Sequence, residues 1–269
     1  LPPVVMGSHL DTQPTGGKFD GIYGVLSGLE VIRSLNDHGI ETEAPIEASV
    51  WTNEEGSRFP PAMVASGVFA GVFDLEYGLS RADLDGKTMG EELERIGYAG
   101  DDEVGGRPFK AFFEAHIEQG PILENEDKTI GVVTDAQGQR WYEVTLTGQE
   151  SHAGPTPMSS RKDALVGAAR IVDQVNRIGL DNAPLACATV GLMNVFPNSR
   201  NVIPGEVFFT IDFRHPDDEV LSNMDAELRV EVERISGEIG LEMDFEQIWY
   251  SPPVAFNTSC VDSVRSAAE

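Results

Sequence analysis

Residues 4–12 read VVMGSHLDT, a short apolar stretch followed by a polar stretch that carries one histidine and one carboxylate. The apolar start predicts a β-strand over Val4–Met6, and the polar residues predict a turn at its end. Apolar residues then recur at helical spacing, at Val25, Leu29, Ile32 and Leu35. Gly39 is well placed to end this helix. A strand that leads through a polar turn into a helix is typical of an α/β layer.

Two further apolar stretches extend this pattern. Ile46–Trp51 and Ala111–Ile117 predict strands, and charged and polar residues lie at or after their ends. Strands that alternate with helices favour a mostly parallel sheet, in which the chemistry lies just beyond the carboxyl ends of the strands. We therefore expect one edge of the sheet to carry the polar clusters at 8–20, 53–58 and 114–120.

The pattern changes near residue 137. Alternating apolar residues predict half-exposed antiparallel strands around Tyr142–Leu146 and Val207–Phe213. Helical spacing predicts one helix over about Ser160–Ile178 and a second over Val220–Ile239. We expect three segments along the chain, namely the first part of an α/β domain at 1–136, an α+β domain at 137–247, and a return into the first domain at 248–269.

The composition excludes several classes of partner. The chain has 269 residues, of which 41% are apolar and 24% charged, as in an ordinary globular protein. Its 45 acidic and 19 basic side chains give a formal charge of −26. This charge repels phosphate backbones and anionic lipids, so we expect no nucleic acid and no membrane as a partner. An anionic small molecule is not excluded, because a local arginine can outweigh the overall field.

The cysteines and the chain ends bear on cellular context. Cys187 and Cys260 lie far apart in the sequence and form no disulfide framework, which favours a reducing compartment. Neither a signal sequence nor an apolar run of the roughly 20 residues that span a bilayer is present. We therefore expect a cytoplasmic protein. Because the chain opens on Leu1 and its last helical pattern stops abruptly, we also expect it to be part of a longer protein.

The first polar cluster contains His9 and Asp11, two apart on an extended segment, and Asp20 in a glycine-flanked turn. An imidazole can bind a metal ion through one nitrogen while a carboxylate accepts a hydrogen bond from the other. The flanking glycines allow the backbone to bring Asp20 close to such an ion. Residue types alone explain the cluster equally well as a solvated loop.

The second cluster contains the adjacent pair Glu54 and Glu55, and the third contains His116. Adjacent carboxylates repel each other unless a cation neutralises them or one stays protonated. One glutamate can bind a metal while the other handles the proton of a metal-bound water. Taken singly, an acidic loop and a hydrogen-bonded structural histidine are the more common explanations. Together the clusters supply His, Asp, Glu and His at successive strand ends, which suits a two-zinc site with a bridging carboxylate.

Several motifs occur in a characteristic order along the chain. They are GSHLDT at 7–12, GGKFDG at 16–21, TNEEGSRF at 52–59, EAHIEQGP at 114–121, SHAGPTPM at 151–158, NVIP at 201–204 and DFR at 212–214. This set resembles the hydantoinase/carbamoylase branch of the M20 metallopeptidase superfamily, which includes N-carbamoyl-L-amino-acid hydrolases, β-ureidopropionases and allantoate amidohydrolases. The short spacing between His9 and Asp20 resembles this branch rather than ordinary M20 peptidases.

The resemblance implies a mostly parallel-sheet dinuclear metallohydrolase domain, without its C-terminal part, and an inserted α+β lid and dimerisation domain. It also implies two divalent metal ions, which could be zinc, manganese, cobalt or nickel. His9 and His116 would bind one ion, and Asp20 would bridge to the second ion, which Glu55 would bind. The family takes a further histidine ligand from a C-terminal segment that is not present in this sequence.

The resemblance further implies which residues act on the substrate. Glu54 would be the general base and Asp11 would orient His9. His152 would stabilise the oxyanion in the site of a partner subunit of a homodimer. The residues expected to bind the substrate are Gln119, Asn201 and Arg214. Without the resemblance, a loop-capping role for His152 and a surface ion pair for Arg214 would be favoured.

The implied reaction is hydrolysis of the carbamoyl C–N bond of an N-carbamoyl-L-amino acid to the amino acid, CO₂ and ammonia. Arg214 suits the substrate carboxylate, because a guanidinium binds a carboxylate through two parallel hydrogen bonds. Allantoate and 3-ureidopropionate carry the same groups and remain alternatives. A dipeptidase or aminoacylase is disfavoured by the spacing of His9 and Asp20. A non-catalytic binding protein is disfavoured for the intact protein, because all the metal-ligand residues expected in this part of the chain are present, but it remains an alternative for this fragment alone.

Overall fold

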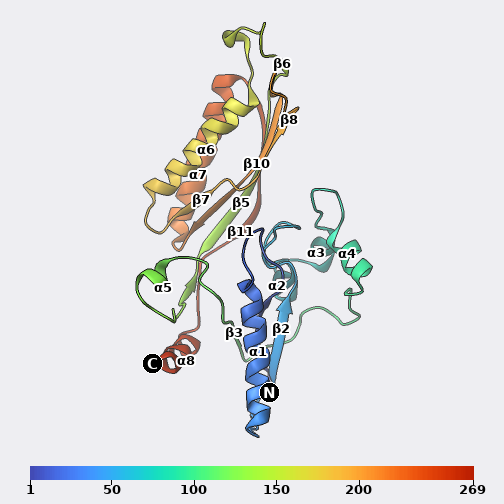
Figure 1. Cartoon of the computed structure of the whole chain (residues 1–269), viewed down its shortest axis with the longest axis vertical. Coiled ribbons are helices and arrows are strands. Elements are labelled where there is room, and N and C mark those ends of the chain that lie inside the picture. The colour runs from blue at the N-terminus through green and yellow to red at the C-terminus, as the bar shows by residue number, and fades with distance from the viewer. The chain divides into compact units, whose positions relative to one another are not determined.

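The computed structural model describes all residues, 1–269 (Figure 1). They divide into two compact units, Leu1–Gly131 and Val132–Glu269. The first unit contains a parallel sheet and the second contains antiparallel sheets, so the expected mixed α/β fold with a parallel sheet is confirmed. The expected domain boundaries after residues 136 and 247 stay predictions.

The first unit is built around a three-stranded parallel sheet in the order β2–β1–β3. Its strands are β1 (Val4–His9), β2 (Ile46–Trp51) and β3 (Ala111–Phe113). Its helices are α1 (Asp20–Asp37), α2 (Val64–Phe69), α3 (Leu75–Ser80), α4 (Met89–Ile96) and α5 (Ile122–Asn125). Val4 lies opposite both Ile46 and Ala111, so the strands begin level with one another and their carboxyl ends lie at the same edge.

Helix α1 packs along the parallel sheet against β1 and β2 (Figure 1). It ends where the sequence predicts, because Gly39, which follows the capping residue His38, takes a positive φ of 62°. Its glycines allow close packing. A side chain at Gly24 would meet the Ala115 carbonyl oxygen at 2.4 Å. The segment after β3 thus approaches α1 directly.

Strand β3 is shorter than the predicted strand over 111–117. It pairs with β1 only over Val4–Met6, and the chain from Glu114 to Gln119 has no regular structure. Here Ser8 donates a side-chain hydrogen bond to the Glu114 carboxylate, and the Ala115 carbonyl approaches α1. These contacts replace the pattern of a continued strand, so His116 lies on an irregular segment.

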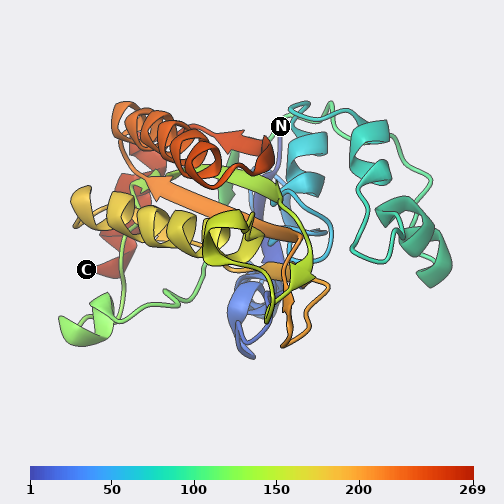
Figure 2. The same ribbon diagram turned by 90° about the horizontal axis from the view of Figure 1, so that it is seen from above.

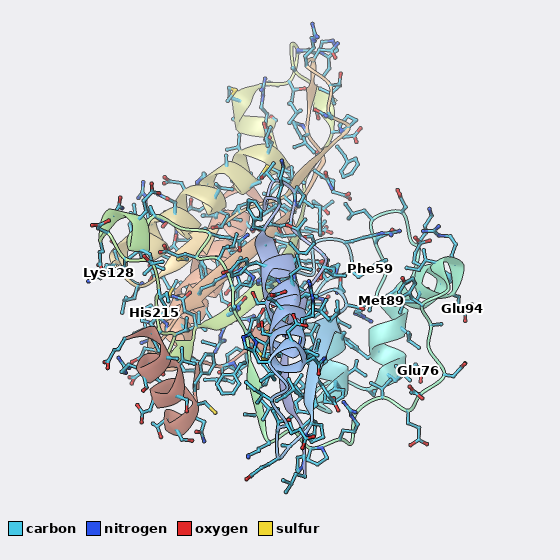
Figure 3. The ribbon with its side chains drawn as sticks, turned by 60° about the horizontal axis from the view of Figure 1, so that its bottom comes forward. Phe59, Glu76, Met89, Glu94, Lys128 and His215 are labelled. Atoms are coloured by element: carbon cyan, nitrogen blue, oxygen red, sulfur yellow. The ribbon has the colours of Figure 1, made fainter.

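A small apolar cluster joins the helices that follow β2. Phe59, Val64 and Met89 are buried together. Figure 3 labels Phe59 and Met89 of this cluster. Helix α4 begins with a capping box in which Thr88 and Glu91 exchange side-chain and backbone hydrogen bonds. The backbone carbonyl of Phe59 in this cluster accepts a hydrogen bond from the Asn53 side chain, directly before Glu54 and Glu55.

The second unit is built on a five-stranded antiparallel sheet with the path β11–β5–β10–β7, and β8 also pairs with β10. Its strands are β5 (Gly138–Thr147), β7 (Cys187–Thr189), β8 (Met193–Phe196), β10 (Glu206–His215) and β11 (Glu242–Ser251). Two short ribbons pair β4 (Asp135–Ala136) with β12 (Val254–Ala255), and β6 (Ser151–His152) with β9 (Val202–Ile203). The remaining helices are the 3₁₀ turn η1 (Met158–Ser160), α6 (Ala164–Asp181), α7 (Asp218–Ile239) and α8 (Thr258–Ala268).

The core of the second unit lies between this sheet and helices α6 and α7, which run along the same face (Figures 1 and 2). The alternation predicted for β10 is confirmed, because Phe213 is fully buried while Asp212 and Arg214 on the opposite face are partly exposed. Helix α6 begins later than predicted, because the Asp163 side chain caps its first amides. No helix of the chain combines the length and the apolar character needed to cross a membrane.

We predict that Leu228→Ala in α7 lowers the free energy of unfolding by about 2–5 kcal/mol, because a fully buried leucine leaves a cavity when it is shortened. Leu180→Ala in α6 removes the same atoms from a side chain that is 65% exposed and should change stability by less than about 0.5 kcal/mol. Urea denaturation measures both values. Equal effects of the two substitutions would contradict the position of the core.

Candidate metal centre

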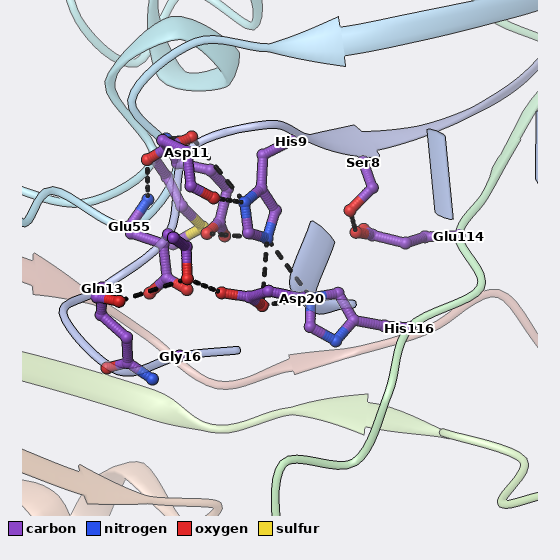
Figure 4. Close-up of polar contacts among 12 residues, drawn as sticks. Ser8, His9, Asp11, Gln13, Gly16, Asp20, Glu55, Glu114 and His116 are labelled. Carbon is purple, nitrogen blue, oxygen red and sulfur yellow. Dashed lines mark hydrogen bonds and ion pairs between the residues drawn. The ribbon is translucent and has the colours of Figure 1, made fainter. Parts of the chain in front are cut away.

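The ends of the three parallel strands bring the polar clusters of the first unit together, as expected (Figure 4). His9 is the last residue of β1 and is only 2% exposed. Glu54 and Glu55 follow β2, and His116 follows β3. The side chains converge because parallel strands of matching register present their carboxyl ends at one edge.

The two histidines point their Nε2 atoms at each other across 3.3 Å. His9 Nδ1 lies 2.7 Å from the Asp11 carbonyl oxygen, and His116 Nδ1 lies 2.8 Å from the Ile117 carbonyl oxygen. A carbonyl only accepts hydrogen bonds, so each Nδ1 carries a proton and donates it. In the neutral imidazole the lone pair is then on Nε2, which is the form that binds a metal ion.

Asp20 is the first residue of α1 and lies beside the two histidines. Its side chain is 3% exposed. Its Oδ1 atom lies 3.4 Å from His116 Nε2 and 3.9 Å from His9 Nε2. This buried oxygen has no hydrogen-bond partner. The other oxygen, Oδ2, accepts a hydrogen bond of 2.6 Å from the Thr12 hydroxyl. An unpartnered buried carboxylate oxygen between two lone pairs is unfavourable unless a cation lies there.

Glu54 and Glu55 also lie near the imidazole ring of His9. Glu54 Oε2 is 3.6 Å from His9 Nε2. Burial raises the pKa of Glu54 above its ordinary value. Burial, a hydrogen bond with Asp20 and the charges of Asp20 and Glu54 raise the pKa of Glu55 to about 7. The two carboxyl groups therefore hold their protons more tightly than exposed glutamates do.

At His9 and Asp20 the neighbouring groups outweigh the effect of burial on the pKa. Burial alone would lower the pKa of His9, but the hydrogen bond to the Asp11 carbonyl and the nearby carboxylates outweigh it, so the pKa is raised. Burial alone would raise the pKa of Asp20, but the Thr12 hydrogen bond, the contact with Glu55 and the histidines lower it. A proton near the His9 ring thus partly takes the place that a metal cation would occupy.

The donor atoms fit a divalent metal ion. His9, Asp20 and His116 form one group of donors and His9, Glu54 and Glu55 form a second, each within 4.8 Å. Tetrahedral ligands at about 2.0–2.1 Å from zinc lie about 3.3 Å from one another, which matches the histidine separation. Nitrogen and carboxylate donors suit zinc, manganese, cobalt and nickel alike. We conclude that this site can hold a metal ion.

Asp11 contacts His9 differently from the expectation. The His9 ring donates to the backbone carbonyl of Asp11, while the carboxylate lies 3.7 Å from the same nitrogen. The carboxylate instead accepts hydrogen bonds from the backbone amides of Glu54 at 3.1 Å and Glu55 at 3.0 Å. Asp11 therefore joins the end of β1 to the glutamate loop as well as orienting the histidine.

Gln119 lies close to the same loop, but its side chain is directed to the backbone. Its amide donates a hydrogen bond of 3.2 Å to the Gly16 carbonyl oxygen. Gln119 is exposed and takes a positive φ of 52°. It can thus reach a ligand, and its role in substrate binding stays a prediction.

The other predicted site residues belong to the second unit. His152 is exposed in β6, and its Nδ1 accepts a hydrogen bond from the Gly154 amide, which is the loop-capping contact considered above. Asn201 lies beside it, because its carbonyl accepts from the Ala153 amide at 3.0 Å. Both residues lie near the ribbon of β6 and β9, next to the beginning of β10.

Arg214 lies at the opposite end of the second unit. Its guanidinium forms an ion pair with Asp212, with a shortest distance of 2.8 Å. From Glu206 to Arg214, β10 spans about 26 Å at roughly 3.3 Å per residue. Asn201 and Arg214 of one chain are therefore too far apart to bind the same carboxylate.

Three contributors to the site were not singled out from the sequence. The Thr12 hydroxyl holds Asp20, the Ser8–Glu114 hydrogen bond supports the segment of His116, and Gly21 makes room for a ring. A side chain at Gly21 would meet the His9 ring at 2.4 Å. Thr12 and Gly21 lie within the motifs quoted above, but motif position alone does not reveal a contact.

We predict that binding of Zn²⁺ to the metal-free protein releases protons and weakens as the pH falls. His9 has a raised pKa and Glu55 a pKa of about 7, so both must lose protons to become ligands. Below pH 7 the affinity should fall roughly tenfold per pH unit for each proton displaced. Calorimetric titration in buffers of different ionisation enthalpy counts these protons. A binding enthalpy that is independent of the buffer would contradict the protonation described here.

The sequence is similar to a known protein family and to individual proteins of known name. The family model described as Peptidase family M20/M25/M40 matches residues 5–269. An N-carbamoyl-L-amino-acid amidohydrolase of Rhizobium meliloti is 55% identical over 267 residues, which are 99% of this chain and 64% of that protein. An allantoate amidohydrolase of Bacillus subtilis (strain 168) is 35% identical over 254 residues, which are 93% of this chain and 61% of that protein.

A solved structure is also similar. The crystal structure of an amidase of the hydantoinase/carbamoylase family from Burkholderia vietnamiensis matches with a TM-score of 0.98 and 74% identity, over 100% of this chain and 65% of that chain. The chain thus spans less than two thirds of the length of each of these three relatives. The family match and these similar proteins confirm the resemblance drawn from the motifs, and the chain belongs to peptidase family M20/M25/M40.

Proposed function

We propose that the protein is a metal-dependent amidohydrolase that cleaves the carbamoyl C–N bond of N-carbamoyl-L-amino acids. The observation that carries the proposal is the convergence of two histidine Nε2 atoms and an unpartnered Asp20 oxygen beside a glutamate with a raised pKa. This combination of metal ligands and a base suits metal-assisted hydrolysis of an unactivated amide.

When bound, a divalent metal ion would lower the pKa of a water molecule toward neutrality and polarise the ureido carbonyl. Glu54 is suited to proton transfer, because its raised pKa brings it nearer to the operating pH. It would take the proton of the attacking water and pass it to the departing amine nitrogen. The water oxygen would add to the carbonyl carbon as this proton is taken, and the C–N bond to the amino acid would break as the proton is delivered. The released carbamate would decompose to CO₂ and ammonia.

The substrate class follows from two sources of support. The N-carbamoyl-L-amino-acid amidohydrolase of Rhizobium meliloti has the higher identity of the two curated relatives compared above. Arg214 provides a guanidinium for a substrate carboxylate, in exchange for its pairing with Asp212. Allantoate and 3-ureidopropionate carry the same two groups, and the relative from Bacillus subtilis is an allantoate amidohydrolase. Parallel assays with the three compounds and a dipeptide would rank these substrates.

We further propose that residues 137–247 act as a lid and dimerisation domain and that the protein is a homodimer. The separation of Arg214 from His152 and Asn201 along β10 supports this proposal. A small substrate held by Arg214 of one chain would receive His152 and Asn201 from the partner, where His152 would stabilise the oxyanion. Gln119 would help to orient the substrate.

We also propose two bound ions of zinc, manganese, cobalt or nickel, with Asp20 bridging and Glu55 binding the second. The pairing of Glu55 with Asp20 and the grouping of Glu55 with His9 support this arrangement. A cytoplasmic location is proposed because Cys187 and Cys260 are both free thiols, as expected in a reducing compartment.

We predict that Glu54→Gln lowers kcat by about 10²- to 10⁴-fold on N-carbamoyl-L-amino acids, because the amide cannot accept a proton. The metal content should stay near normal, because the amide keeps the size of the side chain. Steady-state kinetics and elemental analysis measure the two quantities on the same preparation. Retained turnover would exclude Glu54 as the base, and loss of metal would assign it to metal binding instead.

We predict that two inactive variants restore activity when they share a dimer. Glu54→Gln and His152→Ala are each inactive as homodimers, but in a mixed dimer one site combines Glu54 of one chain with His152 of the other. Random association of equal amounts should restore about a quarter of the normal activity. Co-expression with two affinity tags isolates the mixed dimer. If His152 acted within its own chain, the mixed dimer would be as inactive as its parents.

A further inference from the structure

We propose that Thr12 is a positioning residue whose hydroxyl fixes the rotation of the Asp20 carboxylate and so presents Oδ1 to the two histidines. The inference rests on the metal site of the proposed function and adds to it a residue that is not a ligand. It is carried by the hydrogen bond of 2.6 Å between Thr12 Oγ1 and Asp20 Oδ2.

The two oxygens of the Asp20 carboxylate have different surroundings. A carboxylate can turn about its Cβ–Cγ bond, and this torsion has only a broad preference. Oδ2 is held by the hydroxyl, whereas Oδ1 has no hydrogen-bond partner and lies 3.4 Å from His116 Nε2. The Thr12 hydrogen bond therefore distinguishes the two oxygens and leaves Oδ1 directed at the histidines.

The Thr12 hydroxyl has a single proton to donate. Oγ1 also lies 3.3 Å from the Gln13 carbonyl oxygen, so two acceptors compete for this proton. The Asp20 oxygen is nearer by 0.7 Å and is ionised, and hydrogen bonds to ionised acceptors are the stronger ones. The proton therefore lies toward Asp20.

The loop at Gly16 packs against this hydrogen bond. A side chain at Gly16 would meet Thr12 Oγ1 at 2.3 Å and Asp20 Oδ2 at 3.0 Å, so the backbone of Gly16 packs directly against the pair. The carbonyl of Gly16 accepts a hydrogen bond from Gln119 (Figure 4 shows Gly16 beside Asp20). The loop thus connects the Thr12–Asp20 pair to the residue expected to orient the substrate.

Thr12 itself is exposed, so its side chain contributes little to the core. Replacing the hydroxyl by a methyl group should leave the fold intact and free the Asp20 carboxylate to turn. Residues that orient metal ligands typically change metal affinity by 10- to 100-fold when they are removed. The same size of effect is expected here.

The experiment measures Zn²⁺ affinity of the whole metal-free protein by competition with a chelator, for Thr12→Val and Thr12→Ser. We expect Thr12→Val to bind Zn²⁺ about 10- to 100-fold more weakly, and Thr12→Ser to bind nearly as tightly as the unsubstituted protein. Steady-state kinetics at saturating Zn²⁺ should show a lower kcat for Thr12→Val with little change in KM. The matched control is Thr52→Val, an exposed threonine directly after β2 that makes no hydrogen bond to the cluster.

Gly16→Ala provides a second variant, because its methyl group would displace the hydroxyl while Thr12 stays in place. It should weaken Zn²⁺ binding in the same direction as Thr12→Val. Unchanged affinity in Thr12→Val, or an equal loss in Thr12→Val and Thr12→Ser, would overturn the positioning role. If the unsubstituted protein binds no Zn²⁺, the proposed metal site fails instead, so the two failures are distinguishable.

Discussion

Two imidazole nitrogens and a carboxylate oxygen face one another at the edge of the parallel sheet, and most of the first unit is arranged to hold them there. The backbone carbonyls of Asp11 and Ile117 fix the ring protons on the far side of each histidine. His9 and Asp20 are buried, whereas His116 is exposed. The three inward atoms are electron-rich, so they repel one another unless a proton or a metal cation lies between them. Despite burial, the pKa of His9 is raised, because the hydrogen bond to the Asp11 carbonyl and the nearby carboxylates favour a positive charge on its ring.

This constraint accounts for features of the fold that apolar packing alone does not explain. Helix α1 begins at Asp20 and carries a glycine directly after it, because any side chain at Gly21 would collide with the His9 ring. The chain leaves β3 early, so that His116 can turn toward His9. The formal charge of −26 has a local meaning as well, because some of these carboxylates lie where a cation would neutralise them.

Much of this arrangement could be predicted from the sequence, because it depends on periodicity and on strand polarity. Three apolar strands followed by polar residues predict that His9, Glu54 and His116 meet at one edge, whatever their side-chain rotamers. In the second unit, the alternation around Phe213 predicts which face of β10 is buried. Regular patterns of this kind involve many residues, so single deviations do not obscure them.

Other features could not be predicted, because they depend on single rotations or on irregular backbone. The carboxylate of Asp11 reaches two backbone amides of the next loop, and nothing in a one-dimensional pattern specifies that choice. The early end of β3 depends on contacts with Ser8 and α1, which are distant in sequence. The opposite placement of Asn201 and Arg214 also emerges only once the sheet topology is known.

The central claim is that His9, His116 and Asp20 together bind a divalent metal ion. X-ray absorption spectroscopy at the zinc edge, on the protein loaded with one equivalent of Zn²⁺, tests it most directly. The account predicts imidazole scattering from two histidines with nitrogen and oxygen ligands at about 2.0–2.1 Å, and imidazole scattering reduced to that of one histidine in His116→Ala. A shell of oxygen atoms alone, or a spectrum that His116→Ala leaves unchanged, would contradict it.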